Sequence, residues 1–145
     1  MPAAKAARAK SADSRKVAKP DFAPVFSGLR EVLQRFVSKE IAVQTDKPGN
    51  YHLEVPSILH RKKPLYFAGV RTNKNYVSFY LMCTYYAPDL VKSMSPALKS
   101  RKQGKACFNF TQVDSDCFAE LERVAQAGLK KFKSEKFRKY IQSIQ

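Results

Sequence analysis

Two neighbouring segments rich in aromatic and β-branched residues constrain the fold of this chain most strongly. They are residues 65–71 (Leu-Tyr-Phe-Ala-Gly-Val-Arg) and 76–84 (Tyr-Val-Ser-Phe-Tyr-Leu-Met-Cys-Thr), and the polar segment 72–75 joins them. Aromatic and β-branched side chains favour strands, and so short a connection leaves only antiparallel pairing. The sequence therefore predicts a β-hairpin in the middle of the chain.

Amphipathic helices are predicted on both sides of this hairpin. Apolar residues recur at helical spacing after Asp21, a suitable N-cap, and Pro24 falls in the first turn, so a helix is predicted over 22–39. A second long helix begins at Asp114 or Ser115 and has Gly128 as a potential break in its pattern. The helical spacing then continues to the end of the chain, where the last segment is either docked or frayed.

Further strands are predicted at 41–45, 51–55 and 105–110, with a turn at 47–50 and a charged loop at 60–63. A short helix follows Pro88, and Ser95-Pro96 starts another that ends at Gly104. The order of elements is α-β-β-β-β-α-β-α. It predicts an α+β fold, with an antiparallel sheet of about five strands and helices packed on one face.

The charge is concentrated at the two ends of the chain. Among 145 residues, 27 basic and 12 acidic side chains give a net charge of +15. Residues 1–20 and residues 129–145 each carry six Lys or Arg against one acidic residue. The predicted organisation is a disordered basic tail at 1–20, one α+β domain at 21–132 and a basic C-terminal helical extension at 133–145. The tail is either a tether for nucleic acid or a solvated, solubilising segment.

Cysteine usage and hydropathy predict a cytoplasmic protein with no membrane span. The three cysteines are Cys83, Cys107 and Cys117, an odd number without CxxC spacing, which fits a reducing compartment. The N-terminus has no apolar core of a secretory signal, and the chain has no run of about 18 apolar residues.

A two-residue turn at Asn73-Lys74 would pair Arg71 with Tyr76 and Phe67 with Tyr80. Alternation then places an apolar set of residues under the helices and a polar and aromatic set on the other face. The predicted binding surface on that second face consists of Phe67, Arg71, Tyr76, Ser78, Tyr80, Lys105, Cys107 and Asn109. Aromatic side chains interleaved with basic ones suit protein docking or nucleobase stacking. The alternative is that long loops or the C-terminal helix cover this face.

A second candidate surface is a basic run without an acidic residue inside it. It is an anion patch formed by Lys92, Lys99, Arg101 and Lys102, with Lys105 close by. These side chains would meet phosphates, with a helix N-terminus at Ser95-Pro96 nearby. The alternative is a solvated helix end, where lysines complement the helix dipole.

No catalytic motif is present in the sequence, so no catalytic residue, metal ligand or cofactor is predicted and the chain is not expected to be an enzyme. It contains no GxGxxG, Walker loop, HExxH or GxSxG. Lys102 and Lys105 would favour the thiolate of Cys107, but no His or Asp lies near it in the sequence. His52 and His60 are too few and too far apart for a zinc site without cysteine ligands.

Three segments together resemble the YdhG-like family, a domain of unknown function with a frataxin-like α+β fold. They are Tyr66–Val70, Asn75–Met82 and Gly104–Phe110, and the similarity spans roughly residues 24–130. The resemblance implies a frataxin-like sandwich, a sheet face used for docking and, for some members, iron delivery. Frataxin-type iron binding uses an acidic ridge, whereas this chain offers only Glu31, Glu40 and Asp46 among basic residues.

The leading hypothesis is therefore a small non-enzymatic binding module whose sheet face docks a protein or an anionic ligand. A second hypothesis is non-specific nucleic-acid binding through the basic tails and the run 99–105. A frataxin-like iron carrier and an enzyme using the Cys107 thiol are the remaining alternatives.

Overall fold

The protein's structure, a computed structural model, describes residues 21–144; the predicted tail at 1–20 lies outside this range. Within it, one antiparallel sheet has the strand order β1-β2-β3-β4-β6-β5. The strands are β1 (Ala42–Lys47), β2 (Asn50–His60), β3 (Lys63–Thr72), β4 (Val77–Leu81), β5 (Lys102–Gln103) and β6 (Cys107–Phe110). The helices are α1 (Ala23–Gln34), α2 (Cys83–Tyr86), α3 (Asp89–Lys92), α4 (Pro96–Lys99), α5 (Ser115–Lys133) and α6 (Glu135–Ser143).

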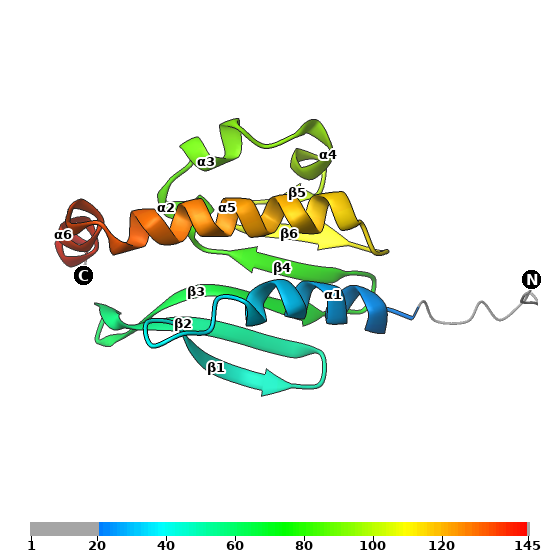
Figure 1. Ribbon diagram of the computed structural model, residues 1–145, viewed down its shortest axis with the longest axis horizontal. Helices are drawn as coiled ribbons and strands as arrows, with labels where there is room; N and C mark the ends of the chain where they lie inside the picture. Colours follow the sequence, from blue (N-terminus) through cyan, green and yellow to red (C-terminus); the bar gives the residue numbers. More distant parts are fainter. Residues whose placement is uncertain (1–20, 145) are drawn as a thin grey trace, which may run out of the picture.

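The α+β class is confirmed, and α1 and α5 lie side by side on one face of the sheet (Figure 1). The sheet has one strand more than expected, because β5 adds two residues beside β6. The helix predicted after Pro88 is α3, and the one predicted to start at Ser95-Pro96 is α4, which ends at Lys99 rather than at Gly104. α2 was not predicted, because the strand was expected to continue to Thr84. This change matters for function, because the short helices and β5 surround the candidate site described below.

The core lies between the sheet and the two long helices. Residues with no exposed surface come from every layer, including Leu29 and Leu33 of α1, Phe79 of β4 and Leu121 of α5. Burial of such side chains contributes about 1.5–3 kcal/mol each. Gly128 does not break α5; a Cβ atom built on it would lie 2.1 Å from the Cys83 sulfur, so glycine lets α2 pack closely on α5.

The pairing expected from a two-residue turn between β3 and β4 is wrong by two residues. Thr72 pairs with Val77 and Arg71 with Ser78, so residues 73–76 form the connection. The Asn73 amide donates to the Tyr76 carbonyl at 2.8 Å and closes this turn. Because side chains alternate with period two, a slip by two residues leaves each β4 side chain on its predicted face.

A β-bulge in β3 reverses the predicted faces of Tyr66 and Phe67. Leu53 pairs with Ala68 and Glu54 with Tyr66, so Phe67 is an extra residue. Phe67 therefore points to the helices, is fully buried, and contacts the rings of Phe36 and Phe132. The prediction that Phe67 belongs to the exposed face is wrong, because a bulge shifts the alternation by one residue.

Segment 56–63 is also more regular than predicted. β2 continues to His60, and Arg61 and Lys62, both with positive φ, form the turn to β3 in place of a charged loop. The C-terminal segment docks: α6 packs on β2, and Ile141 has no exposed surface.

Candidate functional site

Four lysines converge on a hollow of about 370 Å³ between α2, α3, α4 and the β5–β6 hairpin. We call it the lysine hollow. It is lined by Thr84, Tyr85, Pro88, Val91, Lys92, Lys99, Lys102 and Lys105. The lysines come from four different local segments, and among residues 21–144 no carboxylate lines the hollow. Its volume falls within the range of about 300–1,000 Å³ typical of small-ligand pockets.

Hydrogen bonds from α5 hold the segment that carries Lys99. Ser95 caps α4 by accepting a bond from the Leu98 amide at 3.2 Å. The Glu120 carboxylate accepts two bonds from Ser95, at 2.7 Å from the backbone amide and at 2.6 Å from the hydroxyl. Charge-assisted bonds of this kind are among the stronger ones in proteins, so α4 is fixed to α5.

A second set of contacts fixes Lys105. The buried Thr84 hydroxyl lies 2.8 Å from the carbonyl oxygens of both Leu81 and Lys105. The Lys105 ammonium lies 5.3 Å from the centre of the Tyr85 ring, within the range of a cation–π contact. Gly104 has φ of +74°, which turns the chain between β5 and β6, and the Lys102 ammonium donates to its carbonyl. Backbone and ring contacts thus gather Lys102 and Lys105 at one rim.

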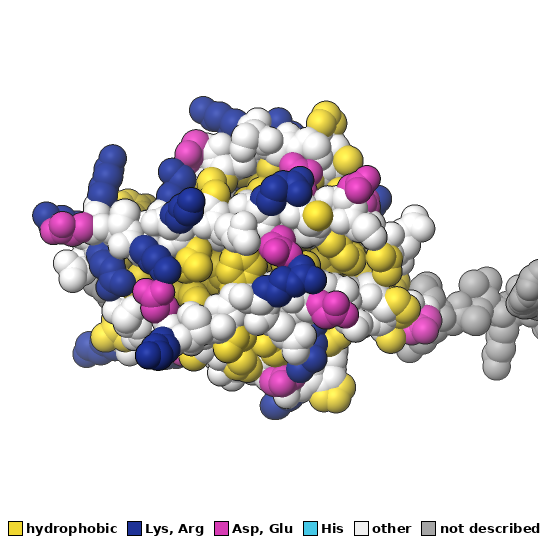
Figure 2. Space-filling view, in the orientation of Figure 1, with side chains coloured by type: hydrophobic (Ala, Val, Ile, Leu, Met, Phe, Trp, Pro, Cys, Tyr) yellow, Lys and Arg dark blue, Asp and Glu magenta, His cyan; other side chains and the backbone are white. Residues whose placement is uncertain are grey.

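The charges of the lysine hollow are not neutralised by the protein. Within residues 21–144, none of its four lysines has a carboxylate within 4.0 Å, whereas Lys131, Lys133 and Lys139 each form an ion pair. On the helix-bearing side of the molecule, Lys, Arg, Asp and Glu side chains lie interspersed (Figure 2). The hollow therefore differs from that surface in holding one sign of charge, which favours an anion.

Three of the four residues predicted as the anion patch line this hollow: Lys92, Lys99 and Lys102. Arg101 does not, because its guanidinium lies 4.0 Å from the Asp114 carboxylate and 5.8 Å from the centre of the Phe110 ring. Lys105 takes its place. Its assignment to the sheet face is wrong, because it lies in the turn before β6 and extends over Tyr85.

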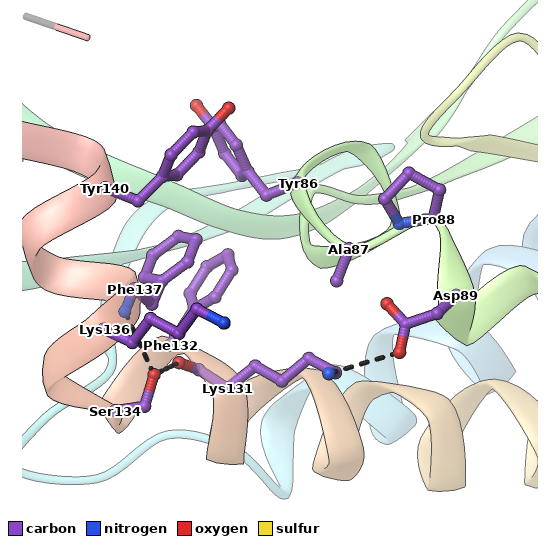
Figure 3. A pocket seen from close by; sticks show the side chains of 10 residues that line it. All are labelled: Tyr86, Ala87, Pro88, Asp89, Lys131, Phe132, Ser134, Lys136, Phe137 and Tyr140. Carbon is purple, nitrogen blue, oxygen red and sulfur yellow. Dashed lines mark hydrogen bonds and ion pairs between the residues drawn. The ribbon is translucent and has the colours of Figure 1, made fainter. Parts of the chain in front are cut away.

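A second hollow, of about 320 Å³, adjoins the first, and four aromatic rings form part of its lining (Figure 3). We call it the aromatic hollow. Its aromatic residues are Tyr86, Phe132, Phe137 and Tyr140, and its other lining residues are Ala87, Pro88, Asp89, Lys131, Ser134 and Lys136. Pro88 lines both hollows. Tyr85 and Tyr86, neighbours in α2, face one hollow each, and their ring centres lie 5.2 Å apart.

The rings of the aromatic hollow form a fixed set of platforms. Phe132 and Phe137 stack at 4.4 Å with an interplanar angle of 11°, and Tyr86 meets Phe137 edge-on at 5.6 Å. Ser134 caps α6 by accepting a bond from the Phe137 amide at 3.1 Å, which sets the angle between α5 and α6. Burial raises the pKa of Tyr86, so its hydroxyl remains protonated at neutral pH. The Lys131 ammonium lies 3.2 Å from Asp89 across the hollow.

The sheet face opposite α1 and α5 carries two cross-strand rows of polar and aromatic residues. Strand register aligns the first row as His52, Gly69, Tyr80 and Cys107. The second row is Asn50, Arg71, Ser78 and Asn109. Of the predicted binding surface, this face therefore brings together Arg71, Ser78, Tyr80, Cys107 and Asn109. Tyr76 lies in the β3–β4 turn and is 38% exposed.

Hydrogen bonds on this face are mostly internal. Ser78 is almost fully buried, and its hydroxyl accepts from the side-chain amide of Asn73 at 2.8 Å and donates to the side-chain oxygen of Asn109 at 2.7 Å. The Cys107 thiol lies 3.3 Å from the same Asn109 oxygen. Donors and acceptors that already satisfy one another have less to offer a partner.

Two members of the face, His52 and Tyr66, were missed by the sequence prediction. Their side chains join through a 2.7 Å hydrogen bond between His52 Nδ1 and the Tyr66 hydroxyl, and His52 stacks on Tyr80 at 6.3 Å. Burial lowers the pKa of His52, with a further contribution from Arg71, and burial raises the pKa of Tyr66. Both groups are therefore neutral at pH 7, and the tautomer of the imidazole sets which of the two donates. The bulge at Phe67, which turns Tyr66 to this face, leaves no signal in the alternation of the sequence.

The thiols and carboxylates do not gather into a reactive or metal-binding group. Burial raises the pKa of Cys107, and that of Cys83 to about 12, so both are protonated thiols at neutral pH. In the part of the chain that the structure describes, no three His, Cys, Asp or Glu side chains come together as metal ligands. Asp46 pairs with Arg30 at 2.9 Å and Glu40 with Lys133 at 2.8 Å.

No protein-family model, curated protein or solved structure matches this chain. The resemblance to the YdhG-like family and the frataxin-like sandwich stay predictions. Within residues 21–144 no helix combines the length and the apolar character needed to cross a bilayer.

Proposed function

We propose that the protein is a binding module for phosphate-bearing ligands and that the lysine hollow is its binding site. The observation that supports this proposal is the convergence of Lys92, Lys99, Lys102 and Lys105 on one hollow in which no residue of the described range 21–144 supplies a neutralising carboxylate. Like charges held near one another repel, and a bound polyanion relieves this repulsion. The chain's net charge of +15 adds long-range attraction to the same class of ligand.

The sheet face supports a docking function less well. Two residues predicted for this face are not on it: Phe67 is buried under the helices, and the Lys105 side chain extends over Tyr85. Much of its remaining hydrogen-bonding capacity is used internally by Ser78 and Asn109. The lysine hollow has both a cavity and unpaired charge, so we prefer it as the site of function. We place this activity in the cytoplasm, since the three cysteines are free thiols.

The proposal is tested by calorimetric titration with inorganic tripolyphosphate at low salt. The variant Lys92→Gln/Lys99→Gln removes two charges from exposed helical positions of the hollow. Its affinity should fall roughly tenfold, which corresponds to about 1.4 kcal/mol. The control Lys74→Gln/Lys130→Gln removes the same charge from exposed positions outside the hollow and should bind like the unmodified protein.

Equal losses in the two double variants would show that only net charge matters, and the proposed site would then be wrong. Absence of saturable binding to the unmodified protein would overturn the proposed function itself. Circular dichroism of each variant shows whether the fold is retained.

A further inference from the structure

The aromatic hollow and the lysine hollow are neighbours, and their chemistry differs in a way that fits one ligand. One offers ammonium groups, the other ring faces, and Pro88 lines both. Single-stranded nucleic acids present this combination, because phosphates alternate with bases whose flat faces stack on aromatic side chains. Double helices hide those faces inside the base stack.

We infer that the protein binds single-stranded nucleic acid, with phosphates in the lysine hollow and at least one base in the aromatic hollow against Tyr86 and Tyr140. The inference rests on the proposed function, because the phosphates of the strand occupy the same lysines. It adds a second subsite and a recognition element, the unpaired base.

Exposure of the tyrosines supports this assignment. Tyr85 is 49% and Tyr140 46% exposed, and they flank the two hollows from α2 and α6. Tyr140 packs edge-on against Tyr86 at 6.2 Å, and Tyr86 in turn contacts the buried Phe132 at 6.2 Å. The exposed rings are therefore supported from behind by the core, which limits the entropy that they lose when a base stacks on them.

The lysines around the aromatic hollow disfavour a cationic partner, and its rings favour nucleic acid over an acidic protein. Lys136 is exposed at the rim of this hollow, and Lys131 also lines it. Asp89, which pairs with Lys131, is the single carboxylate that the described part of the chain contributes to the lining. A quaternary ammonium or a basic peptide would meet these lysines and the four of the neighbouring hollow. An acidic peptide would satisfy the lysines, but its carboxylates gain nothing from the ring faces, whose quadrupole attracts cations and not anions.

The test compares three labelled ligands of equal nucleotide number by fluorescence anisotropy: a twenty-nucleotide oligouridylate, an abasic strand of the same length and a G·C-rich duplex of ten base pairs. The unmodified protein should bind the oligouridylate at least about five-fold more tightly than the abasic strand, because stacking of one base contributes that factor or more. The duplex should also bind more weakly. Tyr140→Ala should lose this preference, Tyr140→Phe should keep it, and Tyr76→Ala, a tyrosine exposed in the β3–β4 turn, should leave it unchanged.

A direct readout comes from Tyr140→Trp, which introduces the only tryptophan of the chain. Its fluorescence should be quenched by oligouridylate and not by the abasic strand. Equal affinity for all three ligands, or for polyglutamate of the same charge, would overturn the inference and leave the proposed phosphate site standing. If the protein binds neither oligouridylate nor tripolyphosphate, both proposals are overturned.

Discussion

The ammonium of Lys105 lies 5.3 Å from the centre of the Tyr85 ring, so a lysine of the lysine hollow contacts an aromatic ring of α2. The contact brings together two segments twenty residues apart, α2 and the β5–β6 hairpin. The Thr84 hydroxyl, 2.8 Å from the Lys105 carbonyl oxygen, fixes the backbone beneath it. Lys105 is one of the four lysines on which the proposed function rests, and the Tyr85 ring lies 5.2 Å from that of Tyr86 in the aromatic hollow.

Binding of oligouridylate should weaken steeply as salt increases, because bound phosphates release counterions from the strand. Each phosphate contact to a single strand contributes roughly 0.7 to the slope of log affinity against log salt. Lys92→Gln/Lys99→Gln should therefore lower the magnitude of the slope by roughly one unit or more, as measured by anisotropy at several potassium chloride concentrations. An unchanged slope would mean that these lysines do not contact phosphate.

Gly128→Ala should destabilise the fold although alanine favours helices over glycine by about 1 kcal/mol. The new Cβ would lie 2.1 Å from the sulfur and 2.5 Å from the Cβ of buried Cys83. Overpacking of this kind typically costs about 1–3 kcal/mol, measured as the free energy of unfolding in urea. Ala127→Gly, at an exposed position of the same helix, measures how much the difference in helix propensity between alanine and glycine changes the free energy of unfolding. A Gly128→Ala variant more stable than the parent would contradict the close packing of α2 on α5.

Stability should decrease as the pH falls below the ordinary His52 pKa of 6.5, because folding lowers that pKa. In this range the unfolded chain binds a proton that folded His52 resists, so stability rises with pH between the folded and the unfolded pKa. Urea unfolding between pH 7.5 and 5.5 should show this slope, and His52→Gln should reduce it. An identical slope in the variant would assign the pH dependence to other groups.

The three thiols should react slowly with iodoacetamide near pH 7. Burial raises the pKa of Cys107, that of Cys83 to about 12 and that of Cys117 to about 11, and only the thiolate reacts. Mass spectrometry of the native protein should show faster alkylation only at alkaline pH. Rapid modification of Cys107 at pH 7 would contradict its raised pKa and would support a nucleophilic role for its thiol.

The fold class was predictable because local patterns and the tertiary arrangement agree in most of the chain. Alternation in 105–110 places Phe108 and Phe110 in the core and Cys107 and Asn109 on the other face, as observed. Ser78 and Tyr80 also lie on the predicted face although the predicted turn was wrong, because the register differs by two residues and side chains alternate with period two. Phe67 could not be placed, because a bulge is determined by pairing with a neighbouring strand rather than by local alternation.

The candidate site was only partly predictable, for a different physical reason. Three lysines of the hollow lie in one basic stretch and its surroundings, and they were recognised as an anion patch. Whether Arg101 or Lys105 completes the group depends on which way short helices and a two-residue strand turn the chain. The aromatic hollow joins α2 to α6 across more than fifty residues, a contact that periodicity within either helix does not encode.

The most direct test of the central claim is a two-dimensional amide NMR titration of the full chain with tripolyphosphate. Saturable chemical-shift changes should concentrate in residues 84–106, around the four lysines of the hollow, and should be lost in Lys92→Gln/Lys99→Gln. Changes confined to the sheet face around Tyr80 and Asn109, or to residues 1–20, would contradict the assignment of the lysine hollow as the ligand site.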